Sequence, residues 1–244
     1  MRISIITVCY NAEDTIEQTI RSVVQQTYTN IEYIIVDGHS KDGTMDIVHS
    51  YDAQISTIIS EDDNGIYDAM NKGIRVATGD YIQFLGADDC LVDPYTIERV
   101  CNAICDDTDV FSAPCIAVNE RYHCEGLLDA EGVSKEDVSS LPKLPHPGVF
   151  VRSDVLKQQQ FDTSYRIAAD LKLLLKLYYT MQKKFQFADF PVTYFSLGGV
   201  SNKEQKHAEM ENQRIIKDLA LSDHASALLP HGTSVKLKSL IRNI

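Results

Sequence analysis

The sequence lacks several features that would each indicate a different class of protein. No stretch approaches the ~20 apolar residues that a membrane-spanning helix needs, and the N-terminus has no signal-peptide cleavage pattern. Positive charge is scarce: 23 lysine and arginine residues against 35 acidic residues give a formal net charge of -12. Such a charge repels the phosphate backbone of nucleic acids. The six cysteines form no C-x-x-C pair, so we expect buried free thiols in a cytoplasmic protein that does not bind nucleic acid.

Two motifs of nucleotide-binding proteins are absent as well. No G-x-G-x-x-G follows the first predicted strand, and the sequence contains no Walker lysine loop. The segment after that strand reads YNAEDT and carries no basic residue. We therefore exclude a dinucleotide-dependent dehydrogenase and a P-loop enzyme.

The chain has enough apolar residues for one α/β domain. Of its 244 residues, 44% are hydrophobic, and apolar runs alternate with segments of helical periodicity in its first part. Buried strands are predicted at residues 3–9, 31–36, 55–59 and 81–85, with helices between them. The last of these helices is predicted to have an apolar face formed by Ile66, Met70, Gly73, Ile74 and Ala77. This alternation predicts a doubly wound, mostly parallel sheet.

The periodicity weakens after residue 107, where strands and long loops are predicted. Leu171 and Leu174 then mark an amphipathic helix, and a helix with a polar face is predicted at 204–222. Asp170 immediately precedes the first of these helices, so its side chain is predicted to cap the helix N-terminus, where the dipole keeps a carboxylate ionised. We expect the second half to extend the same sheet.

Ligands of an open parallel sheet bind beyond the carboxyl ends of its strands, and this rule selects residues without any motif. Tyr10 follows the first strand, Asp37 ends the second, and Asp88 and Asp89 follow the fourth. Asp37 can accept hydrogen bonds from a ribose or a base, or it can form the turn in DGHSKDGT, and the two roles are compatible. Tyr10 can stack on a base or lie at the edge of the core.

Asp88 and Asp89 are adjacent carboxylates, which repel each other unless a cation lies between or beside them. Mg²⁺ and Mn²⁺ use one or two carboxylates together with substrate phosphates. A solvated loop is the alternative, but a position directly after a buried strand favours the metal. Such a cation would also allow a strongly acidic protein to accept a diphosphate substrate.

Three segments resemble the nucleotide-binding half of glycosyltransferase family 2 in order, spacing and wording. They are ISIITVCYN, DGHSKDGT and NGIYDAMNKGIRVATGDYIQFLGADD, within residues 2–92. A weaker similarity continues through HPGVFVRSDVL and IAADLKLLLKL to residue 201. The resemblance implies a GT-A fold, a doubly wound and mostly parallel sheet with an acceptor-side extension. It divides the chain into a nucleotide-sugar-binding half at 1–107, an acceptor-binding and catalytic-base half at 108–201 and a C-terminal helical extension at 202–244.

The resemblance also implies a metal-dependent glycosyltransferase that inverts the anomeric centre. Tyr10 and Asp37 would hold the nucleoside of a UDP- or GDP-linked sugar donor. Asp88, the last acid of the family's D-x-D motif, would bind the donor through Mn²⁺ or Mg²⁺, with Asp89 as a second metal ligand. Asp170 would act as the catalytic base toward the acceptor hydroxyl.

Two positions depart from the family pattern. Gly86 stands where the family has the first acid of D-x-D, and Ala169 stands where an acid precedes the base. Metal ligation therefore depends on Asp88 and Asp89, and Asp170 stands alone. The Q-x-x-R-W motif of processive synthases is missing because the chain has no tryptophan, so we expect a non-processive transferase in the assembly of cell-surface polysaccharide or glycan.

Two other functions stay open at this point. A nucleotidyltransferase that makes sugar nucleotides also uses a parallel sheet, a metal and acids, but it would normally carry a basic, glycine-rich loop after the first strand. A catalytically inactive relative that binds carbohydrate or nucleotide is the other alternative, and Gly86 is its best support. The acceptor, a saccharide or lipid-linked saccharide, is expected to contact residues 108–165 and the region of His146.

The C-terminal residues 224–244 contain no acidic side chain. They carry Lys236, Lys238 and Arg242 beside an apolar stripe of helical spacing. Because basic amphipathic helices bind anionic interfaces, this segment is predicted either to contact the inner face of a membrane or to pack on the domain as an ordinary terminal helix.

Overall fold

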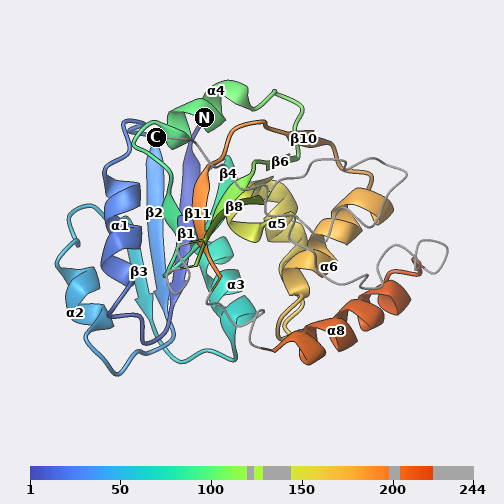
Figure 1. Ribbon diagram of the computed structural model, residues 1–244, viewed down its shortest axis with the longest axis horizontal. Helices are drawn as coiled ribbons and strands as arrows, with labels where there is room; N and C mark the ends of the chain where they lie inside the picture. Colours follow the sequence, from blue (N-terminus) through green and yellow to red (C-terminus); the bar gives the residue numbers. More distant parts are fainter. Residues whose placement is uncertain (120–123, 129–143, 198–203, 222–244) are drawn as a thin grey trace.

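A seven-stranded sheet with helices on both faces forms the centre of the protein (Figure 1). The computed structural model describes residues 1–119, 124–128, 144–197 and 204–221. In the first part of the chain the elements are β1 (Ile3–Cys9), α1 (Ile16–Val24), β2 (Ile31–Asp37), α2 (Thr44–His49), β3 (Thr57–Ser60), α3 (Ile66–Val76), β4 (Tyr81–Gly86), β5 (Cys90–Leu91) and α4 (Thr96–Ala103). They continue with β6 (Val110–Ser112), β7 (Cys115–Asn119), β8 (Cys124–Leu128), η2 (His146–Gly148), β9 (Val149–Arg152), α5 (Ser153–Gln159), α6 (Ala169–Leu175), η3 (Lys176–Thr180), β10 (Phe185–Phe187), β11 (Thr193–Ser196) and α8 (Gln205–Asp218).

The central sheet has the strand order β10-β6-β9-β4-β1-β2-β3. β1 pairs in parallel with β2 and β4, and β3 pairs in parallel with β2 at the edge of the sheet. β9 is antiparallel to both β4 and β6, and β10 is parallel to β6. Strands from the second half of the chain thus continue the sheet that the first half begins, and the predicted fold class is confirmed.

Successive residues of the central strands point to opposite helical layers. Along β1, Ile3 and Ile5 belong to the core under α1, α2 and α4, whereas Ile6 and Val8 belong to the core under α3, α5 and α6. Figure 1 shows α1 and α2 on one side of these strands and α3, α5 and α6 on the other. Because both faces are covered, the strands consist of continuous apolar runs.

The apolar face of α3 differs from the predicted one at its first position. Ile66 is 47% exposed, whereas Tyr67, Met70 and Ile74 are buried. The helix begins at Ile66 directly after Gly65, whose φ of 110° turns the chain sharply. The first helical residue therefore faces solvent, and Tyr67 takes the buried place in the first turn.

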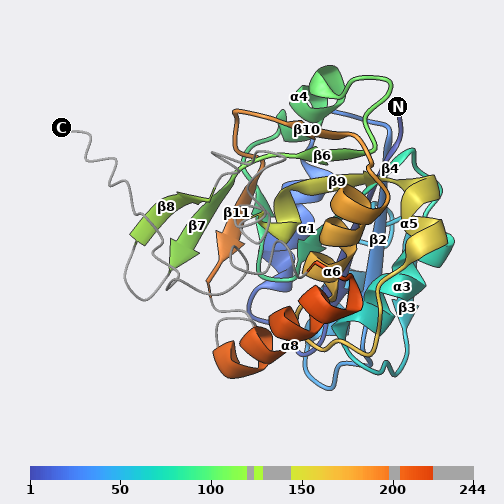
Figure 2. The same ribbon diagram turned by 90° about the vertical axis from the view of Figure 1, so that its right-hand side faces the viewer.

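A second sheet with the strand order β5-β11-β7-β8 projects from the central one (Figure 2). The helix predicted at 204–222 is present as α8, whose Ile215 is fully buried in the same core as the leucines of α6. In the part of the chain that the structure describes, no helix is long and apolar enough to cross a membrane. The basic, apolar-striped segment 224–244 lies outside the described residues.

Candidate active site

The carboxyl ends of β1, β2 and β4 lie at the same edge of the sheet. In the parallel register Cys9 lies opposite Asp37, and Val8 lies opposite Gly86. The residues that follow these strands therefore share one edge, where an open α/β sheet binds its ligands. The donor-binding and metal-binding candidates of the sequence all belong to this edge.

The Asp37 carboxylate closes the turn that follows β2. The residue is fully buried, and Oδ2 accepts hydrogen bonds from the Ser40 backbone N–H at 3.0 Å and from the Ser60 hydroxyl at 2.7 Å. Oδ1 accepts a further bond from the Ser40 hydroxyl. These bonds tie the β2 turn to the end of β3, which is the turn role considered from the sequence. A contact between Asp37 and a nucleoside stays a prediction.

Tyr10, Gly38 and Asp63 come together beyond this edge. Tyr10 is 62% exposed, so its ring is available to a flat ligand. A Cβ added at Gly38 would lie 2.5 Å from Oδ2 of Asp63 and 3.4 Å from Cδ2 of Tyr10, so a larger residue at position 38 would displace the Asp63 carboxylate. The sequence analysis missed Asp63. The strand-end rule would have found it had the rule been applied to β3, which ends at Ser60.

The loop that carries Asp63 is fixed by α3. Lys72 is 9% exposed, and its Nζ donates a hydrogen bond to the backbone oxygen of Asp62 and forms an ion pair with Glu61 at 3.0 Å. Asp63 accepts a hydrogen bond from the Gly65 N–H at 2.8 Å through Oδ1. The position of Asp63 therefore depends on the same helix that contributes Tyr67.

Asp88 and Asp89 have different environments. Asp88 is exposed, whereas Asp89 is 3% exposed. The Asp89 carboxylate accepts hydrogen bonds from the backbone N–H groups of Ser196 at 2.9 Å and Gly86 at 3.2 Å. Burial raises the pKa of Asp89 to about 7, and the neighbouring charge of Asp88 adds to this effect. Asp89 therefore joins the β4 loop to β11, and its role as a second metal ligand stays a prediction.

Gly86 lies close against the Asp89 carboxylate. A Cβ added at residue 86 would lie 2.7 Å from Oδ2 of Asp89, so the first acid of a D-x-D motif at this position would require the Asp89 side chain to shift. Among the described residues, no cluster of three or more His, Cys, Asp or Glu side chains could hold a metal ion by itself. The exposed Asp88 nevertheless fits a cation that takes its other ligands from donor phosphates, as Mg²⁺ and Mn²⁺ do.

Asp170 is the second residue of α6 and not its N-cap. The helix begins at Ala169, and its N-cap is Ala168, which makes no side-chain capping bond. Glu211 of α8 instead holds the segment that leads into α6, because its carboxylate accepts hydrogen bonds from the backbone N–H groups of Ile167 at 2.9 Å and of the N-cap residue Ala168 at 2.8 Å. The side chain of Asp170, 28% exposed, is thereby left free for other contacts.

The Asp170 carboxylate has two neighbours that the sequence analysis did not name as site residues, Tyr67 and His146. The Tyr67 hydroxyl lies 2.8 Å from Oδ1, and Nδ1 of His146 lies 3.9 Å from Oδ2. Burial raises the pKa of Tyr67, and the Asp170 charge raises it further. His146 was expected only to lie near the acceptor. Sequence alone could not find the Tyr67 contact, because the two residues are 103 positions apart.

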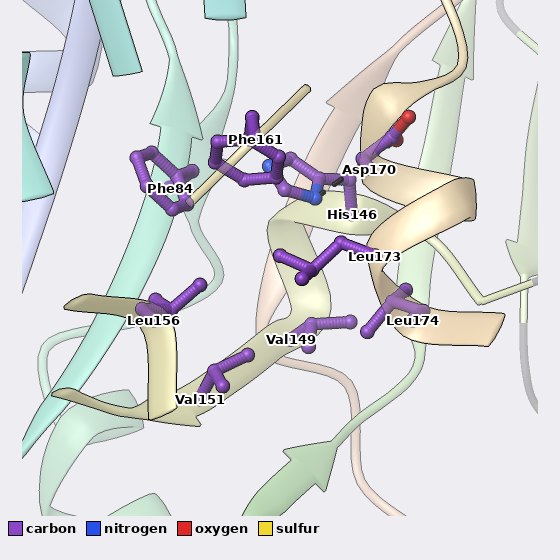
Figure 3. Close-up of a pocket in the computed structure, with 9 residues that line it drawn as sticks. All are labelled: Phe84, His146, Val149, Val151, Leu156, Phe161, Asp170, Leu173 and Leu174. Carbon is purple, nitrogen blue, oxygen red and sulfur yellow. Dashed lines mark ion pairs between the residues drawn. The ribbon is translucent and has the colours of Figure 1, made fainter. Parts of the chain in front are cut away.

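An apolar pocket lies behind Asp170 (Figure 3). The ring of His146 is stacked on Phe84 with centroids 5.4 Å apart and meets the edge of Phe161 at 5.9 Å. Burial lowers the pKa of His146, against the opposite effect of Asp170. The carboxylate therefore stands where a neutral aromatic wall meets the start of α6, and Figure 3 shows its oxygens at the rim of this pocket.

Solved structures with the same architecture are glycosyltransferases. The protein is similar to S. aureus TarS 1–349 in complex with UDP-GlcNAc, with a TM-score of 0.73 and 20% identity, over 93% of this chain and 72% of that one. It is also similar to the mannosyltransferase PcManGT from Pyrobaculum calidifontis in complex with GDP-Man and Mn²⁺, with a TM-score of 0.69 and 16% identity, over 93% of this chain and 72% of that one. These likenesses confirm the predicted GT-A fold.

Relatives with similar sequences identify the family of this protein. It is 28% identical over 207 residues to a PGL/p-HBAD biosynthesis glycosyltransferase of Mycobacterium bovis, over 82% of this chain and 78% of the relative. It is 43% identical over 90 residues to TuaG of Bacillus subtilis, a glycosyltransferase named for teichuronic acid biosynthesis, over 36% of each chain. The model of glycosyl transferase family 2 matches residues 4–125, half of the chain. The protein belongs to this family, as the resemblance in its sequence implied.

Proposed function

We propose that this glycosyltransferase is metal-dependent and transfers a sugar from a UDP- or GDP-linked donor to an acceptor hydroxyl, with inversion at the anomeric carbon. The acceptor would be a saccharide or lipid-linked saccharide of a cell-surface polysaccharide or glycan. Support for the donor comes from the UDP-GlcNAc and GDP-Man named for the two solved structures, and support for the setting comes from the name of TuaG.

One observation carries the proposal. The loop and first turn of α3 contribute to both sides of the candidate site, because Asp63 lies against Gly38 and Tyr10 while Tyr67 contacts Asp170. A donor held at the strand ends would therefore lie near the Asp170 carboxylate. The link is α3: the loop before it carries Asp63 on the donor side, and its first turn carries Tyr67, which contacts Asp170. This arrangement suits a reaction in which a hydroxyl attacks the donor sugar from one side.

The reaction is an in-line displacement. The acceptor oxygen forms a bond to C1 of the sugar as the bond from C1 to the phosphate oxygen breaks, and the nucleoside diphosphate leaves with the electron pair. Asp170 takes the proton from the attacking hydroxyl, for which it needs to be ionised and reachable. Tyr10, Asp37 and Asp63 would contact the nucleoside, and Asp37 would also hold the turn after β2 in place through its bonds to Ser40 and Ser60.

Asp88 would hold the divalent cation together with the phosphates of the donor. When bound, Mn²⁺ or Mg²⁺ acts as a Lewis acid that offsets the charge of the leaving diphosphate. Asp89 would contribute to this site indirectly, because its bonds to Gly86 and Ser196 fix the loop from which Asp88 projects.

A donor screen with an Asp170→Asn variant tests this function. The parent protein is incubated with UDP-glucose, UDP-GlcNAc and GDP-mannose in the presence of Mn²⁺, and release of UDP or GDP is followed with a panel of saccharide acceptors. Asp170→Asn is expected to reduce turnover by a factor on the order of 10²–10⁴, the usual range for general acid-base catalysis. Donor affinity should hardly change, because the base acts on the acceptor.

Asp154→Asn is the matched control. Asp154 is the second residue of α5, as Asp170 is of α6, but its carboxylate pairs with Arg152 outside the site. It should keep parental turnover and melting temperature. Near-parental turnover of Asp170→Asn would contradict the assignment of the base. Incorporation of a nucleoside triphosphate into a sugar nucleotide would instead identify a nucleotidyltransferase, and binding without turnover would identify an inactive relative.

A further inference from the structure

The Tyr67 hydroxyl has two acceptors for one proton. Its oxygen lies 2.5 Å from the backbone oxygen of Ile167 and 2.8 Å from Oδ1 of Asp170. A phenolic hydroxyl donates one hydrogen bond and can accept others through its lone pairs. Both partners can therefore be satisfied together only if the proton is shared or if one of them is itself a donor. A carbonyl oxygen never donates, whereas a carboxyl group donates when it is protonated.

We propose that Tyr67 is a positioning residue that holds Asp170 in one place in both of its protonation states. With Asp170 ionised, the Tyr67 hydroxyl directs its proton to Oδ1. Once Asp170 has taken a proton, the hydroxyl turns its own proton to the Ile167 carbonyl and accepts a hydrogen bond from the Asp170 carboxyl. This inference rests on the proposed role of Asp170 as the base.

Such a switch matters because a base must be stabilised before and after proton transfer. The proton that leaves the acceptor hydroxyl ends on an Asp170 oxygen, and it leaves to solvent after the products depart. A fixed donor would favour only the ionised carboxylate and so oppose the transfer. A hydroxyl that rotates favours both states and keeps the carboxyl group in one orientation, which reduces the reorganisation needed at the moment of reaction.

The surroundings fix the tyrosine ring while leaving the hydroxyl proton free to rotate. Tyr67 is 6% exposed, and its ring packs against Phe161 with centroids 5.4 Å apart. Glu211 accepts hydrogen bonds from the N–H groups of Ile167 and of Ala168, which shares a peptide with the Ile167 carbonyl, so the carbonyl acceptor is itself anchored. On the other side of the carboxylate, the His146 ring gives Oδ2 an aromatic neighbour beyond hydrogen-bond distance. Of the groups named here, the Tyr67 hydroxyl is the one within hydrogen-bond distance of Oδ1, so it can reverse its donor and acceptor roles when Oδ1 gains a proton.

The test is a double-mutant cycle with Tyr67→Phe, Asp170→Asn and the combined variant. Phenylalanine keeps the ring and removes the hydroxyl. We expect Tyr67→Phe to lower kcat by a factor on the order of 10–100, the value of one charge-assisted hydrogen bond, with an unchanged donor KM. In the Asp170→Asn background it should lower kcat no further, because residues that act as a unit are non-additive.

Tyr81→Phe is the control for loss of a buried tyrosine hydroxyl. Tyr81 is 5% exposed, and its hydroxyl donates to the backbone oxygen of Thr108 at 2.5 Å, under the opposite helical layer. Its kcat should equal that of the parent. If Asp170→Asn abolishes turnover while Tyr67→Phe behaves like Tyr81→Phe, the positioning role of Tyr67 is overturned and Asp170 remains the proposed base. If Asp170→Asn retains turnover, Asp170 is not the base, and the inference about Tyr67 is overturned with that assignment.

A second measurement needs no substrate. The urea midpoints of the parent, Tyr67→Phe, Asp170→Ala and the combined variant are compared without ligand. Because the two side chains share a hydrogen bond, the shift of the combined variant should differ from the sum of the single shifts. Additive shifts would overturn the inference even if no donor in the panel supports turnover.

Discussion

Burial keeps the imidazole of His146 neutral near pH 7. The ring lies between Phe84, Phe161 and the start of α6, and its pKa is lowered by loss of solvent despite the nearby Asp170. Its Nε2 is buried and has no hydrogen-bond partner among the residues that the structure describes. Charging the ring in this position opposes folding, so the residue links stability to pH.

We expect the unfolding free energy of the parent protein to fall as the pH drops below about 6.5, the ordinary pKa of histidine. In that range the unfolded chain binds a proton at His146 that the folded protein does not bind, so acid favours unfolding. His146→Phe should remove this part of the pH dependence, which urea denaturation between pH 5 and pH 8 would measure. His49→Phe, at a histidine whose side chain is 57% exposed, should retain it. An unchanged slope in His146→Phe would contradict the reading.

Sequence reasoning placed the candidate residues that follow a strand directly at the correct edge of the sheet, and it missed the contacts that depend on tertiary structure. Asp37, Asp88 and Tyr10 were predictable because strand ends converge in any parallel sheet. The use of Asp89 was not, because its partner Ser196 is 107 positions away. Tyr67 was missed because Ile66 was taken as the first residue of the buried face, whereas the turn at Gly65 leaves Ile66 exposed and Tyr67 buried.

α8 holds the segment that leads into α6, the helix that carries the proposed catalytic base Asp170. α8 itself contributes no candidate catalytic group. Glu211 is 9% exposed, and its carboxylate accepts hydrogen bonds from three consecutive backbone N–H groups, those of Arg166 at 2.6 Å, Ile167 and Ala168. Figure 2 shows α8 lying beside α6, and Glu211 reaches the N-cap residue of α6. The carboxylate thus satisfies the N–H of the N-cap residue Ala168, which the helix leaves unpaired, and those of the two residues before it.

We expect Glu211→Gln to destabilise the protein by about 1.5–3 kcal/mol, the range for hydrogen bonds to a charged group, because an amide nitrogen would face a backbone donor. Turnover should fall as well, since the first turn of α6 would lose its anchor. Urea denaturation and the nucleotide-release assay measure the two effects. Glu209→Gln, on the exposed side of the same helix, is the control. Equal midpoints for the two variants would show that the capping bonds contribute little.

The order of the elements was predictable, and the pairing of the later strands was not. Long apolar runs separated by helical periodicity predict parallel strands, and β1, β2 and β4 lie where the sequence placed them. β6 and β10 have only three residues each, too few for a reliable pattern, and their place in the sheet is set by β9 running antiparallel between β4 and β6. The second sheet joins β5, β11 and β7 from distant parts of the chain.

At the scale of the whole molecule, a formal net charge of -12 must be reconciled with an anionic donor. A long-range field of this sign disfavours a diphosphate, so a divalent cation is expected to be needed for tight donor binding. A ligand that binds only the folded protein stabilises it, by about 2.7 kcal/mol when its concentration is 100 times its Kd. Thermal stability therefore reports donor binding before any acceptor is known.

We expect UDP or GDP to raise the melting temperature with Mn²⁺ and to lose most of this effect when EDTA replaces the metal. Asp88→Ala should melt like the parent without ligand and lose the Mn²⁺-dependent increase, because its carboxylate would no longer hold the cation. Asp106→Ala, which removes an exposed acid outside the site, should keep the increase. The same Mn²⁺-dependent increase in Asp88→Ala and the parent would remove Asp88 from the metal site.

The contact between residues 86 and 89 also constrains how this protein can be converted to a two-acid metal motif. Gly86→Asp alone would place a new Cβ 2.7 Å from a buried carboxylate oxygen, so the Asp89 side chain would have to move. That movement would disturb the bonds that its carboxylate accepts from the Gly86 and Ser196 N–H groups, and with them the link between the β4 loop and β11. A second acid at position 86 would therefore loosen the same loop that carries Asp88.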